Sequence, residues 1–229
     1  MKKKIVVLTG AGISAESGLS TFRDSGGLWE GHDVMEVASP GGWRRNKELV
    51  LDFYNQRRRQ LINAKPNEAH ISLVKLEDKF DVTIITQNVD DLHERAGSSN
   101  IFHLHGKLNN ARSTVDPDLI YELNGKDINV GDKCEKGSQL RPDIVWFGEM
   151  VPMMDEAIKA SHSAEIFIII GTSLQVYPAA SLIEFVPDNA DKFLIDPSKP
   201  EYPIQKMNLE YIQKNATIGT KELVQKLIL

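Results

Sequence analysis

Residues 5–15 read Ile-Val-Val-Leu-Thr-Gly-Ala-Gly-Ile-Ser-Ala. An apolar run without polar alternation predicts a strand that helices cover on both faces, as in a parallel sheet. Residues 10–15 then fit the G-x-G-x-x-G/A pattern, between a strand and a helix. In this pattern Gly10 allows a tight turn, Gly12 lets a pyrophosphate approach the backbone, and Ala15 allows close helix–strand packing. We expect a dinucleotide-binding turn whose helix start offers free N–H groups to the anion, although the pattern alone also fits a glycine-rich turn that binds nothing.

The rest of the chain alternates between apolar runs and helical patterns. Three more runs read as buried strands: Val82–Thr86, Ile166–Ile170 and Lys192–Ile195. The spacing of apolar residues predicts three helices: Asn46–Ala64, Glu68–Lys79 and Thr220–Leu229. This alternation predicts an α/β fold with a Rossmann-like, doubly wound parallel sheet. The polar region Leu108–Pro142 shows little periodicity, so we expect a smaller inserted lobe or a long loop system there.

The segment after the glycine turn departs from the dehydrogenase pattern. About 20 residues on, that pattern has a strand ending in an acid that binds the adenine ribose. Residues 21–29 instead read Thr-Phe-Arg-Asp-Ser-Gly-Gly-Leu-Trp, which is a loop by composition. This argues against a hydride-transfer enzyme and indicates a loop that covers a cofactor.

Composition narrows the classes of partner. The 229 residues carry a net charge of -5, with a pI of about 5.7, so there is no basic footprint for nucleic acid or an anionic membrane. No apolar run approaches the ~20 residues that cross a bilayer, and the apolar stretch behind the basic start ends at Thr9, too early for a signal peptide. A single cysteine, Cys134, rules out an intramolecular disulfide. We expect a cytoplasmic monomer that binds neither nucleic acid nor membrane.

Ordered blocks along nearly the whole chain resemble the sirtuin family. They are Gly-Ala-Gly-Ile-Ser (10–14) followed by Gly-Leu-Ser-Thr-Phe-Arg (18–23), Thr-Gln-Asn-Val-Asp (86–90), His-Leu-His-Gly (103–106), Val-Trp-Phe-Gly-Glu (145–149) and Gly-Thr-Ser (171–173). The resemblance is closest to the bacterial class that is similar to the human desuccinylating and demalonylating sirtuin. It implies one catalytic domain over residues 1–229. Its Rossmann-like lobe would cover about 1–30, 80–106 and 143–229, and its small lobe about 31–79 and 107–142.

The resemblance implies NAD as co-substrate and an acyl-lysine protein or peptide as partner. In this reaction the acyl-lysine carbonyl oxygen attacks the ribose C1′ of NAD and nicotinamide leaves. A ribose hydroxyl, activated by a histidine base, then attacks the resulting imidate. The products are free lysine, nicotinamide and O-acyl-ADP-ribose.

The resemblance also implies residue roles. His105 matches the base, with Asn88 as its catalytic companion, and an unperturbed histidine is largely neutral at pH 7. The residues expected to bind NAD are Gly10, Ala11, Gly12, Ser14, Ala15, Phe22, Arg23, Trp29, Gln87, Asn88, Asp90, Gly171, Thr172, Ser173 and Asp196. The segment expected to pair with substrate backbone as an added strand contains Val145, Trp146, Phe147 and Gly148. From the residues alone, His103 and His105 remain alternatives for the base.

Tyr54 and Arg57 lie at i, i+3 in a predicted helix and so share a face. In the acidic-acyl sirtuins a Tyr-x-x-Arg pair meets the distal carboxylate of the acyl group, which implies a preference for succinyl or malonyl over acetyl. An arginine fork can hold a carboxylate through two hydrogen bonds, and tyrosine adds a hydroxyl donor. For Arg58 and Arg59 we expect a solvated basic helix face.

The pattern breaks at the metal site of the family. Most sirtuins carry a structural zinc held by two cysteine pairs, whereas Cys134 stands alone here with Gly137 where its partner is expected. A tetrahedral thiolate site cannot be built, so no zinc is expected, and the alternative that Cys134 recruits Asp or His ligands is disfavoured. At Asp196-Pro197 the family usually has an Asn–acid pair near the adenine ribose, and Asp196 could accept the ribose hydroxyls instead.

Two other functions remain open at this point. A mono-ADP-ribosyltransferase would use the same NAD site and the same cleavage of the nicotinamide bond. A catalytically weak NAD-binding protein would bind NAD without releasing nicotinamide. Product analysis separates these from an NAD-dependent deacylase.

Overall fold

A six-stranded parallel sheet forms the centre of the molecule in the computed structural model, which describes residues 2–21, 28–29, 31–199 and 208–229. The strand order is β11-β10-β9-β1-β4-β5. The strands are β1 (Lys4–Thr9), β4 (Asp81–Thr86), β5 (Ile101–His103), β9 (Ile166–Ile170), β10 (Asp191–Ile195) and β11 (Leu209–Ile212). The chain leaves β1 toward β4 on one side and returns to β9 on the other. This reversal of strand order creates a crevice at the carboxyl ends of the strands.

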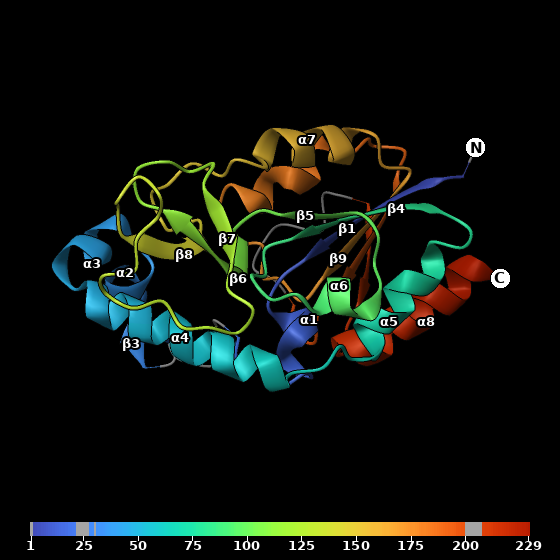
Figure 1. The fold of residues 1–229 in the computed structure, drawn as a ribbon. Coiled ribbons are helices and arrows are strands. Elements are labelled where there is room, and N and C mark those ends of the chain that lie inside the picture. Colours follow the sequence, from blue (N-terminus) through green and yellow to red (C-terminus); the bar gives the residue numbers. More distant parts are fainter. Residues whose placement is uncertain (1, 22–27, 30, 200–207) are drawn as a thin grey trace.

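Helices cover both faces of this sheet (Figure 1). One face packs against α5 (Glu68–Leu76) and α8 (Ala216–Ile228), and the other against α7 (Met154–His162) and the 3-10 helix η1 (Ala179–Phe185). Successive residues of β1 point to opposite faces, with Ile5 and Val7 in one core and Val6 and Leu8 in the other. Burial on both faces explains why these strands read as unbroken apolar runs.

A smaller lobe lies beside the sheet, at the left of Figure 1. It contains the antiparallel sheet β7-β6-β8 and the helices packed on it. Its elements are β2 (Leu28–Trp29), β3 (His32–Asp33), α2 (Val34–Val37), α3 (Pro40–Arg45), α4 (Lys47–Asn63), β6 (Gly106–Ser113), β7 (Ile120–Glu122) and β8 (Leu140–Ile144). Helix α4 begins where the Asn46 side chain accepts a hydrogen bond from the Leu49 N–H, and it ends at Asn63, three residues before Pro66.

The predicted fold class is confirmed, and the predicted strands agree with the structure to within one residue. The helix predicted over Glu68–Lys79 ends earlier, at Leu76, and the helix predicted from Thr220 begins earlier, at Ala216. The region 108–142 is more regular than predicted, because β7 and β8 pair with β6. The division into two lobes by residue range stays a prediction.

The expectation for Arg58 was wrong. Its side chain is fully buried, and two bonds offset the cost of that burial: Nε donates to the Leu108 carbonyl oxygen (2.9 Å) and Nη1 to Asn55 Oδ1 (2.8 Å). Arg59 is exposed and pairs with Asp127, as expected for a solvated face. Within the described ranges, no helix is both long enough and apolar enough to cross a bilayer.

Candidate functional site

A cavity of about 510 Å³ lies at the carboxyl edge of the large sheet and extends under the small lobe. Gly10, Gln87, Gly171 and Asp196 each follow directly on a strand of that edge and line the cavity. The predicted site residues that line it are Gly10, Ala11, Gly12, Ser14, Ala15, Trp29, Tyr54, Arg57, Gln87, Asn88, Asp90, His105, Val145, Trp146, Phe147, Gly148, Gly171, Thr172, Ser173 and Asp196. Phe22 and Arg23 lie outside the described residues. The cavity therefore brings together side chains from distant parts of the chain.

The structure gives a packing reason for the two glycines of the turn, beside the roles expected from the sequence pattern. A Cβ at Gly12 would lie 2.6 Å from Gly171 Cα, and a Cβ at Gly10 would lie 2.7 Å from the Gly171 carbonyl oxygen. Both glycines are thus required by the close approach of the turn to the end of β9. Helix α1 (Gly12–Ala15) is a single turn.

Two details of the expected anion site were wrong. The N–H groups of Gly12, Ile13 and Ser14 already donate to carbonyl oxygens, at 2.9, 3.1 and 3.1 Å, so they are not free for a ligand. Ala15 is exposed and lines the cavity, so its small side chain does not serve helix–strand packing. Ligand contacts at this turn would therefore come chiefly from side chains.

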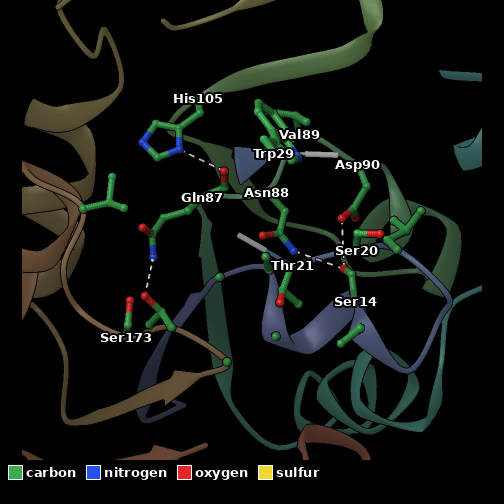
Figure 2. A pocket seen from close by; sticks show the side chains of 18 of the residues that line it. Ser14, Ser20, Thr21, Trp29, Gln87, Asn88, Val89, Asp90, His105 and Ser173 are labelled. Atoms are coloured by element: carbon green, nitrogen blue, oxygen red, sulfur yellow. Dashed lines mark hydrogen bonds between the residues drawn. The ribbon is translucent and has the colours of Figure 1, made fainter. Parts of the chain in front are cut away.

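A buried polar network stands at the centre of the cavity (Figure 2). Ser14 Oγ donates to Asp90 Oδ2 at 2.9 Å, and Asn88 Nδ2 donates to Ser14 Oγ at 3.1 Å. The Leu92 N–H holds the other Asp90 oxygen at 3.1 Å. Burial raises the pKa of Asp90, while its hydrogen bonds from Leu92 and Ser14 act in the opposite direction. These side chains offer oxygen and amide groups in fixed orientations.

The tautomer of His105 is set by the backbone. Its Nδ1 lies 2.9 Å from the Gln87 carbonyl oxygen, which can only accept, so Nδ1 carries the proton and Nε2 keeps its lone pair (Figure 2). Burial lowers the pKa of His105, and the bond to Gln87 raises it by a smaller amount. The side chain of Gln87 is itself held by a bond to Thr172 Oγ1 at 3.1 Å. His105 therefore presents a neutral, oriented base to the cavity.

His103 has a different environment. Its Nε2 lies 2.7 Å from Glu94 Oε1, which also accepts from Lys107, and its Nδ1 lies 3.3 Å from the Asn88 carbonyl oxygen. It does not line the cavity. The structure thus separates the two histidines that the residues alone left as alternatives.

Tyr54 and Arg57 meet at the end of the cavity under the small lobe. Tyr54 is fully buried, and burial raises the pKa of its hydroxyl. The Arg57 guanidinium lies 4.6 Å from the centre of the Trp29 ring and 4.7 Å from that of Phe53. This aromatic wall holds the cation in place, and Arg57 retains 9% exposure. A hydrogen-bond donor and a cation therefore face the same enclosed space.

The segment 145–149 forms one wall of the cavity. Its N–H groups are occupied: Val145 donates to the His105 carbonyl oxygen (3.0 Å), Trp146 to Glu149 Oε2 (2.8 Å) and Phe147 to the Ala38 carbonyl oxygen (3.0 Å). A substrate strand added here would have to use other backbone groups of the segment. The added strand stays a prediction with that restriction.

Other lining residues were missed by sequence reasoning. They include Ser20, Thr21, Gln60, Leu108, Ile144, Val176, Tyr177 and Asn215. Gln60 could have been found, because it lies three residues beyond Arg57 on the same helix. Tyr177 and Asn215 carry no sequence signal, since they reach the cavity from loops.

The small lobe does not contain the donors of a thiolate zinc site. Cys134 Sγ lies 3.4 Å from Ser113 Oγ and 3.1 Å from Ser138 Oγ, and the two hydroxyls are 2.9 Å apart. One thiol and two hydroxyls do not fit tetrahedral zinc. Across the described ranges, His, Cys, Asp and Glu side chains form no group of three or more that could hold a metal ion. We call this set the Ser113–Cys134–Ser138 cluster; it links the ends of the lobe's strands by hydrogen bonds.

Comparisons with known proteins bear on this cavity. The model of the "Sir2 family" matches residues 10–178. An NAD-dependent protein deacylase of Helicobacter pylori (strain J99 / ATCC 700824) is 57% identical over 226 residues, which cover 99% of this chain and 96% of that protein. An NAD-dependent protein deacylase of Bacteroides thetaiotaomicron is 52% identical over 231 residues, covering 99% and 98%.

Solved structures agree. A Sir2 homologue mutant bound to ADP-ribose has a TM-score of 0.91 at 39% identity, covering 99% of this chain and 92% of that one. A Sir2 homologue in complex with NAD has a TM-score of 0.89 at 40% identity, covering 99% and 90%.

Proposed function

The chain belongs to the Sir2 family, and from that premise we propose that it is an NAD-dependent protein lysine deacylase that prefers succinyl or malonyl groups to acetyl. The deacylase activity follows from near full-length relatives of that name. The acyl preference rests on one observation. Tyr54 and Arg57, both on α4 of the small lobe, line the same cavity as His105.

The donor set of the cavity fits NAD. Amides of Gln87 and Asn88 and the carboxylates of Asp90 and Asp196 suit the amide and hydroxyl groups of a dinucleotide. Hydroxyls of Ser14, Thr172 and Ser173 add further partners. When bound, NAD supplies an electrophilic ribose carbon and the hydroxyl that receives the acyl group.

His105 has the features of a general base. Its free Nε2 faces the cavity, and its lowered pKa keeps it neutral at pH 7, ready to take a proton from a hydroxyl. Asn88 is fixed by its bond to Ser14, and we propose that it orients the groups that react.

Arg57 and Tyr54 would bind the distal carboxylate. Arg57 neutralises its charge, and Tyr54, kept protonated by burial, donates a hydrogen bond. An acetyl group would leave both groups without that partner. The loss is about 1–3 kcal/mol, or one to two decades in kcat/KM, so weak deacetylation would remain.

The test uses one peptide sequence carrying either succinyl-lysine or acetyl-lysine, incubated with and without NAD and followed by mass spectrometry. We expect NAD-dependent loss of both groups, with succinyl leaving faster. Arg57→Met should lower the succinyl rate about 10- to 100-fold and leave acetyl removal within a few-fold. Arg59→Met, on the same helix with an exposed side chain, is the matched control and should behave like the wild type.

Each alternative predicts a different result in this experiment. Equal rates on both peptides would overturn the acidic preference while leaving the deacylase activity intact. Protein-linked ADP-ribose, with the acyl groups retained, would indicate a mono-ADP-ribosyltransferase. Bound NAD without nicotinamide release would indicate a catalytically weak binder. We also propose a cytoplasmic monomer, which fractionation and size-exclusion chromatography would test.

A further inference from the structure

Among the described residues, the Tyr54 hydroxyl makes one hydrogen bond, and it accepts in that bond. Trp146 Nε1 lies 3.1 Å from Tyr54 Oη inside the protein. An indole N–H can only donate, so the Tyr54 oxygen accepts and keeps its own proton for another partner. Among the described residues no acceptor for that proton is present, and Tyr54 lines the cavity. The proton is therefore available to a ligand.

Trp146 is held from two sides. The Arg141 guanidinium stacks on its ring at 3.3 Å from the centroid. Glu149 binds Arg141 through both oxygens, at 2.6 and 3.0 Å, and also accepts from the Trp146 N–H at 2.8 Å. Arg112 adds a second cation to Glu149 at 3.1 Å. Because ring and backbone are both fixed, the direction of the indole N–H is fixed as well.

We propose that Trp146 is a positioning residue for acyl specificity: its indole N–H donates to the Tyr54 oxygen, which directs the proton of the Tyr54 hydroxyl into the cavity, toward the carboxylate of a succinyl or malonyl group. Arg141 and Glu149 hold Trp146 in that orientation. This inference rests on the proposed acidic-acyl preference.

The expected effect is selective, for a physical reason. A carboxylate can only accept hydrogen bonds, so it needs a tyrosine that donates. Accepting a bond from Trp146 also strengthens the outgoing bond of the same hydroxyl, because linked hydrogen bonds polarise one another. An acetyl group ends in a methyl and makes no use of the Tyr54 proton. Loss of the indole donor should therefore weaken the binding of a succinyl group more than the binding of an acetyl group.

Trp146→Phe tests this, because it removes the N–H and keeps an aromatic ring against Arg141. We expect kcat/KM for the succinyl peptide to fall about 5- to 20-fold further than kcat/KM for the acetyl peptide, mainly through KM. Trp43→Phe is the matched control. Trp43 packs against Trp146 at 5.6 Å and does not line the cavity, so its loss should leave the ratio of the two rates unchanged.

A double-mutant cycle with Tyr54→Phe shows whether Trp146 acts through Tyr54. In the Tyr54→Phe background, Trp146→Phe should change the succinyl KM by less than about twofold. An equal loss on both peptides in the wild-type background, or the same succinyl loss with and without the Tyr54 hydroxyl, would overturn the proposal. A wild type without succinyl preference would instead refute the proposed acyl preference, which separates the two failures.

Arg141→Lys gives a second route if Trp146→Phe does not fold. Lysine keeps the charge and loses the planar stack and the two-point contact with Glu149. The succinyl KM should rise and the acetyl KM should stay within about twofold of the wild type. An unchanged ratio of the two KM values would refute the role of the Arg141–Trp146 stack.

Discussion

Arg57, Arg58 and Arg59 are consecutive on α4 and have three different environments. Arg57 lies on aromatic rings at the cavity, Arg58 is fully buried, and Arg59 is exposed beside Asp127. A helix turns by about 100° per residue, so neighbours in sequence face different surroundings. Burial lowers the pKa of Arg58 to about 10, so it remains a cation inside the lobe.

Replacing Arg58 should destabilise the protein far more than replacing Arg59. Arg58→Met leaves the Leu108 carbonyl oxygen without its partner and removes a bond to Asn55. We expect a loss of about 2–4 kcal/mol in the free energy of unfolding, measured by urea titration, against less than about 0.5 kcal/mol for Arg59→Met. Similar losses for the two variants would contradict this.

The pH dependence of activity should reflect His105. Only the neutral form of His105 can act as a base. Burial lowers the pKa of His105 below the ordinary 6.5, so the imidazole becomes protonated at a lower pH than an exposed histidine does. We expect kcat/KM for the succinyl peptide to fall on the acid side with a midpoint below pH 6.5. His105→Ala should abolish turnover and retain NAD binding, measured by calorimetry. If the acid-side fall in kcat/KM has its midpoint above pH 6.5, a group other than His105 controls that fall.

At the scale of elements, the small lobe is held by hydrogen bonds at its strand ends. The Ser113–Cys134–Ser138 cluster links the end of β6 to the turn before β8. Ser113 Oγ also accepts from the Val115 and Asp116 N–H groups, at 3.2 and 3.1 Å. It is therefore the central member of the cluster.

Chelation should leave this lobe intact. We expect the melting temperature of protein purified normally to stay within about 1 °C after exhaustive EDTA treatment, since one thiol cannot form a thiolate zinc site. Ser113→Ala should lower the free energy of unfolding by about 1–3 kcal/mol, because it removes the acceptor of two N–H groups and a partner of the buried Cys134 thiol. A large drop in melting temperature with chelator, reversed by zinc, would show that a metal is bound.

Sequence patterns located four strands that are buried on both faces and three helices, and they missed other elements, including strand β6 and helix α7. Strands such as β1 and β9 are buried on both faces, so their composition identifies them. Strand β5 has three residues and is too short for any pattern. Arg58 could not be placed, because a helix pattern does not say that Leu108 and Asn55 offer it oxygen partners. The N–H of Gly12 donates to the carbonyl oxygen of Gly171, which is distant in sequence, so this bond could not be predicted from the local pattern.

At the scale of the whole molecule, two buried histidines link stability to pH. His70 on α5 and His93 on α6 (Leu92–Ala96) have ring centroids 4.9 Å apart. Burial lowers their pKa values to about 4 and about 3. Below pH 6.5 the unfolded chain takes up protons at both positions and the folded protein does not, so acid favours unfolding.

The free energy of unfolding should therefore decrease between pH 6.5 and pH 4, by about 1.4 kcal/mol per pH unit for each histidine. Urea titrations at pH 7 and pH 5 measure this. His70→Gln should remove a substantial part of the difference, since one of the two protonation sites is gone. If His70→Gln shows the same difference in the free energy of unfolding between pH 7 and pH 5 as the wild type, groups other than His70 cause that difference.

The placement of the aromatic residues has an optical consequence. Trp29, Trp43 and Trp146 are the three tryptophans of the chain, and all belong to the small lobe around α4, while neither core of the large sheet contains one. Trp29 touches Arg57, and Trp146 touches Tyr54. Tryptophan fluorescence of the unlabelled protein therefore reports on the acyl end of the cavity. Titration with an acyl peptide can be followed by emission alone, while opening of the sheet would leave that signal largely unchanged.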